Sequence, residues 1–122
     1  MIGYVTIGVN DIEKGKAFWS DLLAPLGASV LMDMGRIALL GTGPGSPMLG
    51  VCIPFDEGDP QPGNGNMVAF NAGSREKVDE LYAKAIEMGA TDEGPAGERA
   101  PTFYGGYFRD PDGNKAAFFH MG

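Results

Sequence analysis

The chain has 122 residues, 43% of them hydrophobic, and a formal net charge of −7 at pH 7. This length suits one domain that buries well over half of its unfolded surface, so folding requires neither a disulfide nor a metal ion. The acidic charge repels phosphate backbones and anionic lipid surfaces, which excludes nucleic acid and membranes as expected partners. The single cysteine allows no internal disulfide and makes the cytoplasm the expected compartment.

The two halves of the chain repeat one pattern, which begins with a strand. Residues 4–7 (YVTI) read like residues 67–70 (MVAF). In a strand, successive side chains point to opposite faces of the sheet. The first strand is therefore expected to place its apolar residues Val5, Ile7 and Val9 on one face and Tyr4, Thr6 and Gly8 on the other.

A helix is expected after each of these strands. Asp11 and Ser74 occupy matching positions, and their short side chains can accept hydrogen bonds from the free amides of a first helical turn. Asn10 with Glu13 is a rival capping pair for the first helix. Gly27 and Gly89 lie where a left-handed residue ends a helix. Apolar residues at helical spacing predict that each helix buries one face; they are Ile12, Phe18, Trp19, Leu22, Leu23 and Leu26, and then Val78, Leu81, Tyr82, Ala85 and Ile86.

Three further strands are expected in each half. In the first half they span residues 29–33, 36–40 and 48–53, and in the second half residues 90–92, 103–109 and 115–120. Residues 93–102 are expected to form a loop that covers the mouth of a pocket. The chain is thus one α+β domain, with module 1 at about residues 1–54, a linker rich in proline and glycine at about 55–65, and module 2 at about 66–122.

Three segments resemble the vicinal oxygen chelate superfamily, which includes glyoxalase I, bleomycin and fosfomycin resistance proteins and extradiol dioxygenases. Residues 3–11 (GYVTIGVND) with residues 17–19 (AFW) resemble its opening, residues 67–79 resemble the start of its second half, and residues 107–115 (YFRDPDGNK) resemble its closing motif. The resemblance covers essentially the whole chain. It implies two β-α-β-β-β modules whose curled mixed sheets form a half-barrel cleft, with one helix per module on the outside, and it implies a homodimer.

The resemblance also implies where a metal ion would lie in an enzyme of this superfamily. There a divalent ion such as Zn, Ni, Fe or Mn sits in the cleft and chelates two neighbouring substrate oxygens. The positions that would supply its His and Glu ligands are Tyr4, Met67 and Ala117 here, and residues 48–53 contain no carboxylate or imidazole. A divalent ion needs several nitrogen or oxygen ligands at about 2 Å. The sequence therefore predicts no metal ligand and no cofactor.

The residues expected to contact a ligand lie on the strands that would line the cleft. They are Tyr4, Thr6, Met67, Ala69, Tyr107, Arg109, Ala117 and Phe119, and no catalytic residue is assigned. Arg109 either clamps a carboxylate or phosphate, or pairs at the end of its strand with Asp110 or Asp112. The aromatic members, Tyr4, Tyr107 and Phe119, either form an aromatic wall or pack in the core.

Other chemically distinctive residues have ordinary explanations. If Ala117 faces the cleft, period two puts the only histidine, His120, on the opposite face, where packing is favoured over ligation. For Cys52 a buried apolar role is favoured over a nucleophile, because no base can be paired with it. For Glu98 and Arg99 a solvated charge pair is favoured over contact with a ligand.

Three functions are compatible with this pattern. The favoured one is a metal-free member of the superfamily that binds a small, partly aromatic or anionic organic molecule, as the drug-sequestering resistance proteins do. The alternatives are a metal-dependent lyase or dioxygenase with non-standard ligands, and an interaction module whose cleft is filled by its own side chains. Fold alone does not choose among them, but metal content and pocket volume do.

Overall fold

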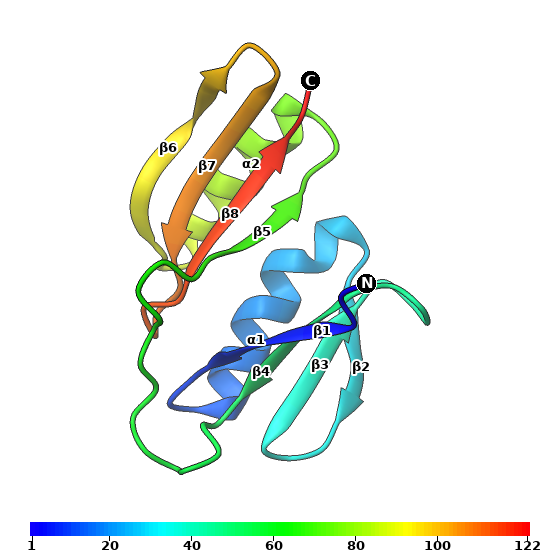
Figure 1. Cartoon of the computed structure of the whole chain (residues 1–122), viewed down its shortest axis with the longest axis vertical. Coiled ribbons are helices and arrows are strands. Elements are labelled where there is room, and N and C mark those ends of the chain that lie inside the picture. Colours follow the sequence, from blue (N-terminus) through cyan, green and yellow to red (C-terminus); the bar gives the residue numbers. More distant parts are fainter. The chain divides into compact units, whose positions relative to one another are not determined.

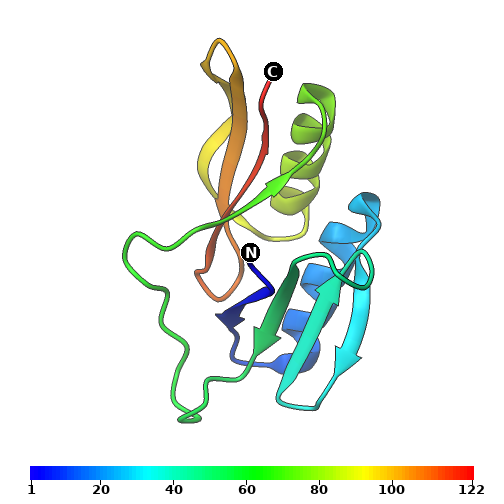
Figure 2. The same cartoon turned by 45° about the vertical axis from the view of Figure 1, so that its right-hand side comes forward.

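The alternating segments that open the two halves are both strands in the computed structural model, which describes all of residues 1–122. The chain forms two units, residues 1–61 and 62–122. Each unit contains one α-helix and a four-stranded mixed sheet (Figures 1 and 2). This confirms the predicted α+β fold with two β-α-β-β-β modules.

The first unit runs β1 (Tyr4–Gly8), α1 (Ile12–Leu23), a short 3-10 turn η1 (Ala24–Leu26), β2 (Ser29–Asp33), β3 (Ile37–Gly41) and β4 (Met48–Cys52). Its strands lie in the order β1-β4-β3-β2. The first strand pairs parallel with β4, with Tyr4 opposite Met48, whereas the other pairs are antiparallel. Three boundaries differ by one residue from the predicted ones, because β3 runs from Ile37 to Gly41 and β4 ends at Cys52.

The second unit runs β5 (Val68–Asn71), α2 (Arg75–Glu87), β6 (Thr91–Ala100), β7 (Phe103–Arg109) and β8 (Lys115–His120), with the strand order β5-β8-β7-β6. The pair β5–β8 is parallel, in the same way as β1–β4. The core of this unit lies between sheet and helix, where Phe108 and Phe118 are fully buried. The Phe118 ring lies 5.4 Å from that of Phe108 and 5.8 Å from that of Phe70, between ring centroids.

The caps that the sequence predicts form at both helices. Asp11, and not its rival Asn10, is the N-cap of α1, and its carboxylate accepts a hydrogen bond of 3.1 Å from the amide of Lys14. Ser74 caps α2 in the same way, by accepting from the amide of Lys77. Gly89 follows α2 with φ 105°, a left-handed conformation in which the missing Cβ avoids a steric clash.

The strict alternation of the first strand divides its side chains between two faces. Ile7 and the following Val9 are buried on the side of α1, where Gly15 approaches Val9 so closely that an added Cβ would lie 2.8 Å from Val9 Cγ1. Tyr4 and Thr6 point to the other side of the sheet. We call this side, which α1 does not cover, the open face of the first sheet.

The segment at residues 93–102 differs from its prediction. Most of it is not a loop, because β6 extends to Ala100 and pairs antiparallel with β7. Its register shifts between Asp92 and Gly94, between Gly94 and Gly97, and between Glu98 and Ala100. Such bulges, at the edge of a sheet, accommodate glycine and proline residues that a regular central strand would exclude.

The two helices are too short and too polar to span a membrane.

Candidate functional site

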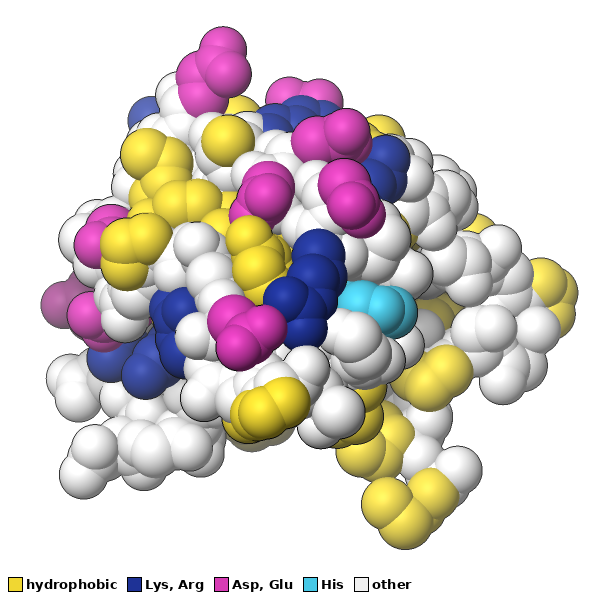
Figure 3. Space-filling view, turned by 90° about the horizontal axis from the view of Figure 1, so that it is seen from above, with side chains coloured by type: hydrophobic (Ala, Val, Ile, Leu, Met, Phe, Trp, Pro, Cys, Tyr) yellow, Lys and Arg dark blue, Asp and Glu magenta, His cyan; other side chains and the backbone are white.

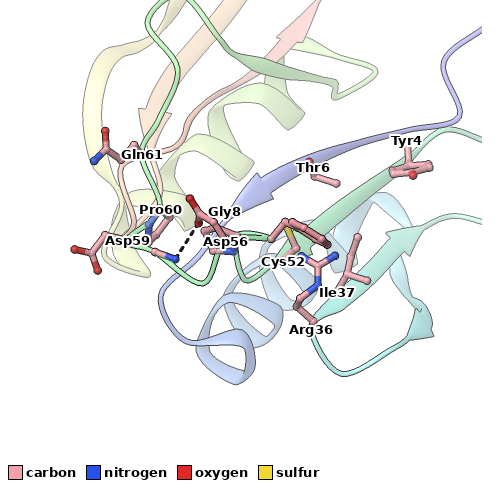
Figure 4. Close-up of a pocket in the computed structure, with 13 residues that line it drawn as sticks. Tyr4, Thr6, Gly8, Arg36, Ile37, Cys52, Asp56, Asp59, Pro60 and Gln61 are labelled. Carbon is pink, nitrogen blue, oxygen red and sulfur yellow. Dashed lines mark hydrogen bonds between the residues drawn. The ribbon is translucent and has the colours of Figure 1, made fainter.

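A cavity of about 750 Å³ lies on the open face of the first sheet (Figure 4). Its floor is formed by one side of three neighbouring strands, and its wall by the segment at residues 54–61. The floor residues are Tyr4, Thr6, Gly8, Ile37 and Cys52, and the wall residues are Pro54, Phe55, Asp56, Gly58, Asp59, Pro60 and Gln61, together with Arg36.

The floor of this cavity includes residues with small side chains or none, which leave space above the sheet. Thr6 lies opposite Gly50 of β4, where an added Cβ would be only 3.0 Å from Thr6 Cγ2. At Gly8 an added Cβ would lie 3.0 Å from Cβ of Pro60, so the wall segment folds back directly onto this end of β1. Glycine at these two positions of neighbouring strands therefore leaves no room for a larger side chain beside Thr6 or beneath Pro60.

The wall segment is held in a defined turn by its own backbone. The amide of Glu57 donates to the carbonyl oxygen of Pro54 at 2.9 Å, and the Asp56 carboxylate accepts from the amide of Gly58 at 2.9 Å. Glu57 has φ 60°, and it is the one residue other than glycine with a left-handed backbone. Such a conformation costs free energy and persists where surrounding contacts impose it.

Arg36 places a positive charge at the edge of the cavity. Its Nη1 donates to the carbonyl oxygen of Ile53 at 2.7 Å, and its Cζ lies 5.6 Å from the ring centroid of Phe55. Neither contact neutralises the guanidinium, because a carbonyl carries no charge and a cation–π contact is a weak interaction at an exposed site. Arg36 therefore has no carboxylate partner.

Several other basic side chains are paired with acids. Figure 3 shows Lys and Arg side chains beside Asp and Glu side chains on the face that it draws. The ion pairs are Lys16 with Glu13 and Asp33, Arg75 with Glu98, Lys77 with Glu80, and Arg109 with Glu93. In a chain with a net charge of −7, an arginine without such a partner at a cavity is a distinctive electrostatic feature.

Two of the eight residues that the sequence selects for ligand contact, Tyr4 and Thr6, line this cavity. The other six belong to the second unit: Met67, Ala69, Tyr107, Arg109, Ala117 and Phe119. Ala117 pairs with both Ala69 and Tyr107 in the sheet, so these three residues share one face. This face is opposite the fully buried Phe118, which packs on the side of α2. Ala117 itself is only 2% exposed.

Aromatic and basic side chains gather on this face of the second sheet. The Tyr107 ring has Arg99 Cζ at 5.2 Å and Lys115 Nζ at 6.0 Å from its centroid. Phe119 stacks on Phe103, with 5.7 Å between centroids. Tyr107 and Phe119 are both half-buried, so they have the combination of packing and partial exposure that an aromatic wall requires.

Arg109 does not form the ion pair with Asp110 or Asp112 that was one of its two expected roles. Its Nε donates to Glu93 on β6 and its Nη1 to the carbonyl oxygen of Gly113 at 2.8 Å. The two expected partners are part of a turn instead, in which the Asp110 carboxylate accepts from the amide of Asp112 at 3.0 Å. Glu93 was not expected as a partner, because β6 was predicted to end before residue 93.

The pair expected between Glu98 and Arg99 does not form either. Glu98 accepts from Nη1 of Arg75 at 2.8 Å, whereas Arg99 donates to the carbonyl oxygen of Pro95 and lies over Tyr107. Neighbours along a strand point to opposite faces, which separates these two side chains. His120 pairs in the sheet with Tyr104, whose hydroxyl donates to Asp79 of α2, so it lies on the helix side as expected.

The residues at the positions of the expected metal ligands do not fit a divalent ion. Tyr4 offers a phenol, Met67 a thioether and Ala117 a methyl group. Cys52 is half-buried and lines the cavity, which corrects the expectation that it is buried, but its neighbours in the sheet are Gly8 and Ile37. Nowhere in the chain do three or more His, Cys, Asp or Glu side chains gather as a metal site requires.

Reasoning from the sequence missed Arg36, Ile37, Cys52 and the wall segment. One sequence feature could have indicated Arg36 as a binding residue: it is a basic residue directly before a strand, and neither of its neighbours in the sequence is acidic. The proline-rich segment was interpreted as a linker only, although Pro60 and the preceding Pro54 both line the cavity. A linker that folds back onto the strand it follows has no distinct sequence pattern.

Comparison with known proteins gives a family and several similar structures. Residues 1–118 match the family model described as Glyoxalase/Bleomycin resistance protein/Dioxygenase superfamily. A glyoxalase/bleomycin resistance protein from Albidiferax ferrireducens T118 is 34% identical, with a TM-score of 0.88 over 100% of this chain and 99% of that chain. A glyoxalase/bleomycin resistance protein/dioxygenase family enzyme from Burkholderia phytofirmans PsJN, 22% identical, has the same fold, with a TM-score of 0.79 over 98% of this chain and 97% of that chain. No curated protein matches the sequence significantly.

Proposed function

This chain belongs to the Glyoxalase/Bleomycin resistance protein/Dioxygenase superfamily, and we propose that within it the chain binds a small organic molecule without a metal ion. The ligand lies on the open face of the first sheet, between the floor of the cavity and the segment at residues 54–61. The observation that carries this proposal is a cavity whose floor offers a phenol, a hydroxyl, a thiol and apolar groups, but no cluster of metal ligands.

The size of the cavity supports binding over a filled cleft. Small-molecule sites typically enclose about 300–1,000 Å³, and the cavity of about 750 Å³ falls within that range. A module whose own side chains filled the face would have no such hollow. Tyr4, which would be the natural plug, is 57% exposed.

The composition of the lining supports an organic ligand. Tyr4, Ile37, Pro54 and Phe55 provide apolar and aromatic surface, while Thr6 provides a hydroxyl that can donate or accept a hydrogen bond. Apolar walls with a few polar groups are typical of small-molecule sites. The apolar part supplies affinity, and the polar groups fix the orientation of the ligand.

Metal analysis and a cavity-filling variant test this proposal together. The purified chain is expected to contain far less than one tightly bound transition-metal ion per chain. A neutral aromatic probe, 2-naphthylmethanol, is expected to shift the amide resonances of residues 4–8 and of the non-proline residues among 52–61 in a protein NMR titration after treatment with EDTA. Thr6→Trp, which fills the floor, should weaken this binding at least about tenfold.

Thr91→Trp is the matched control, because Thr91 is also an exposed strand residue but lies in β6, outside the cavity. It should leave the affinity for 2-naphthylmethanol unchanged. One tightly bound ion per chain would contradict the metal-free proposal and favour an enzyme of lyase or dioxygenase type. Equal effects of the two substitutions would contradict the proposed location.

We also propose that the chain forms a homodimer, as the sequence resemblance implies. Its support is the edge strand β2, all five residues of which are exposed. Three of them are the apolar Val30, Leu31 and Met32. An exposed apolar edge strand is a site where another chain can pair. A cytoplasmic location also stays a prediction from the sequence.

A further inference from the structure

We infer that the ligand of the cavity is an aromatic carboxylate and that Arg36 determines this specificity. The inference rests on the proposed function, because it names the class of molecule that the same cavity selects. It assigns a role to a residue that neither the sequence pattern nor the family resemblance selects.

The guanidinium of Arg36 has donors left for a ligand. Its Nη1 is directed to the carbonyl oxygen of Ile53, while Nε and Nη2 have no partner within the chain. These two nitrogens lie on one edge of the guanidinium, and their N–H bonds run parallel. That geometry matches the two oxygens of a carboxylate, which gives a bidentate, charge-assisted pair.

Contacts on the other parts of Arg36 hold the side chain in place before a ligand arrives. Nη1 is fixed by its hydrogen bond of 2.7 Å to the carbonyl oxygen of Ile53. The Phe55 ring lies near the guanidinium, with 5.6 Å between Cζ of Arg36 and the ring centroid. An arginine held in this way loses less conformational entropy when it binds an anion than a free surface arginine does. The contacts therefore orient the remaining N–H edge and do not compete for it.

Among anions, the charges around the cavity favour one with a single charge over one with two charges. Arg36 is the one basic residue in the lining, and the two acidic residues are Asp56 and Asp59. The Asp56 carboxylate accepts from the amide of Gly58, and Figure 4 shows the Asp59 carboxylate pointing away from the other labelled side chains. One guanidinium can neutralise one carboxylate. A phosphate monoester, with a charge between about −1.5 and −2 at pH 7, would keep an excess of negative charge near these two acids.

The aromatic part of the inference comes from two exposed rings of the same cavity, of which Phe55 lies beside Arg36. Phe55 is 89% exposed and Tyr4 57% exposed, and both line the cavity. A flat ligand ring that covers such surface removes it from water and gains ring–ring contacts of about 0.5–1.5 kcal/mol. A ligand with an aromatic ring next to a carboxylate can contact the Phe55 ring and the guanidinium together.

The test compares ligands that share one ring system and differ in charge. The full chain is titrated by protein NMR with 2-naphthoate, 2-naphthylmethanol and 2-naphthyl phosphate. The wild type is expected to bind 2-naphthoate at least about tenfold more tightly than the neutral alcohol. Arg36→Gln should remove this difference, because it should weaken the binding of 2-naphthoate much more than that of the alcohol. Arg36→Lys, which keeps the charge but not the bidentate geometry, should restore only part of the difference.

Arg99→Gln is the control for this substitution. Arg99 also lies over an aromatic ring and donates to a backbone carbonyl oxygen, but it belongs to the second unit and lies outside the cavity. Its loss should leave the preference for 2-naphthoate intact. Because Arg36 is exposed, Arg36→Gln should fold, and the amide spectra of the variants verify this.

The outcomes separate the two proposals. Equal affinities for 2-naphthoate and the alcohol, together with sensitivity of both to Thr6→Trp, would overturn the role of Arg36 and leave the binding cavity standing. Tighter binding of 2-naphthyl phosphate than of 2-naphthoate would overturn the carboxylate class. The absence of any cavity binding by all three probes would overturn both proposals.

Discussion

The hydroxyl of Tyr82 on α2 donates a hydrogen bond of 2.6 Å to the carboxylate of Asp92 on β6. The contact joins the helix of the second unit to its edge strand. Burial of the phenol, followed by this hydrogen bond, raises the pKa of Tyr82 from 10.0 to about 12. The same hydrogen bond, the largest cause, lowers the pKa of Asp92.

A loss of stability at high pH follows from the raised pKa of Tyr82. A group that binds its proton more tightly in the folded state stabilises that state below its unfolded pKa. Here the contribution is complete below about pH 10 and is lost as the pH rises toward about 12. Urea unfolding at about pH 9 and about pH 11 should show a larger loss for the wild type than for Tyr82→Phe. Equal losses in the two proteins would contradict the assignment.

Substitution of Gly15 by alanine should destabilise the first unit, although alanine favours helix. An added Cβ would lie 2.8–3.0 Å from three carbon atoms of the buried Val9 side chain. Overpacking of this kind costs about 1–3 kcal/mol, which exceeds the gain of about 1 kcal/mol in helix propensity. The free energy of unfolding is measured by urea titration. Gly3→Ala is the control and should have almost no effect, because nothing lies within 4 Å of its Cβ position.

Arg75 should be important for the stability of the second unit. Its guanidinium donates to the carbonyl oxygens of Gly122 and Pro101, each at 3.0 Å, and pairs with Glu98. Arg75→Met leaves these acceptors without a donor, and we expect a loss of about 2 kcal/mol in the free energy of unfolding. The control, Lys77→Met, removes only an exposed pair with Glu80 and should cost less than about 0.5 kcal/mol. A similar cost for both substitutions would show that the three contacts of Arg75 add little.

The proposed dimer predicts a specific response of the edge strand β2. Met32→Lys places a charge in the exposed apolar strand, and it should shift the mass measured by light scattering from two chains to one. Met121→Lys is the matched control, since Met121 is also exposed but lies after the last strand. A monomeric wild type would refute the dimer, and a dimeric Met32→Lys protein would show that the chains pair elsewhere.

The elements with strict periodicity could be predicted from the sequence. The alternation of residues 4–9, the caps at Asp11 and Ser74 and the glycine after each helix are local patterns, and each local pattern agrees with the fold. The strand β6 was missed because its glycines and Pro95 are typical of loops. Pairing with β7 and three bulges override that propensity, and both are tertiary effects.

The candidate site could be predicted only in part, for a related reason. Tyr4 and Thr6 follow from alternation together with the family resemblance. Arg36 could not be placed by alternation, because β3 begins one residue later and the side chain of Arg36 is fixed by Ile53 and Phe55 instead. Contacts between a loop and a strand end depend on how the chain folds back, which no periodic pattern records.

The parallel pairing of β1 with β4 constrains the order in which the chain can fold during synthesis. The strand β1 leaves the ribosome before its neighbour β4, which follows only after α1 and two more strands have been made. Until then β1 carries an unpaired edge, and contacts between distant segments are slow to form. Exposed strand edges promote aggregation of nascent chains. The edge of β1 is therefore exposed for as long as the synthesis of α1 and the strands up to β4 takes.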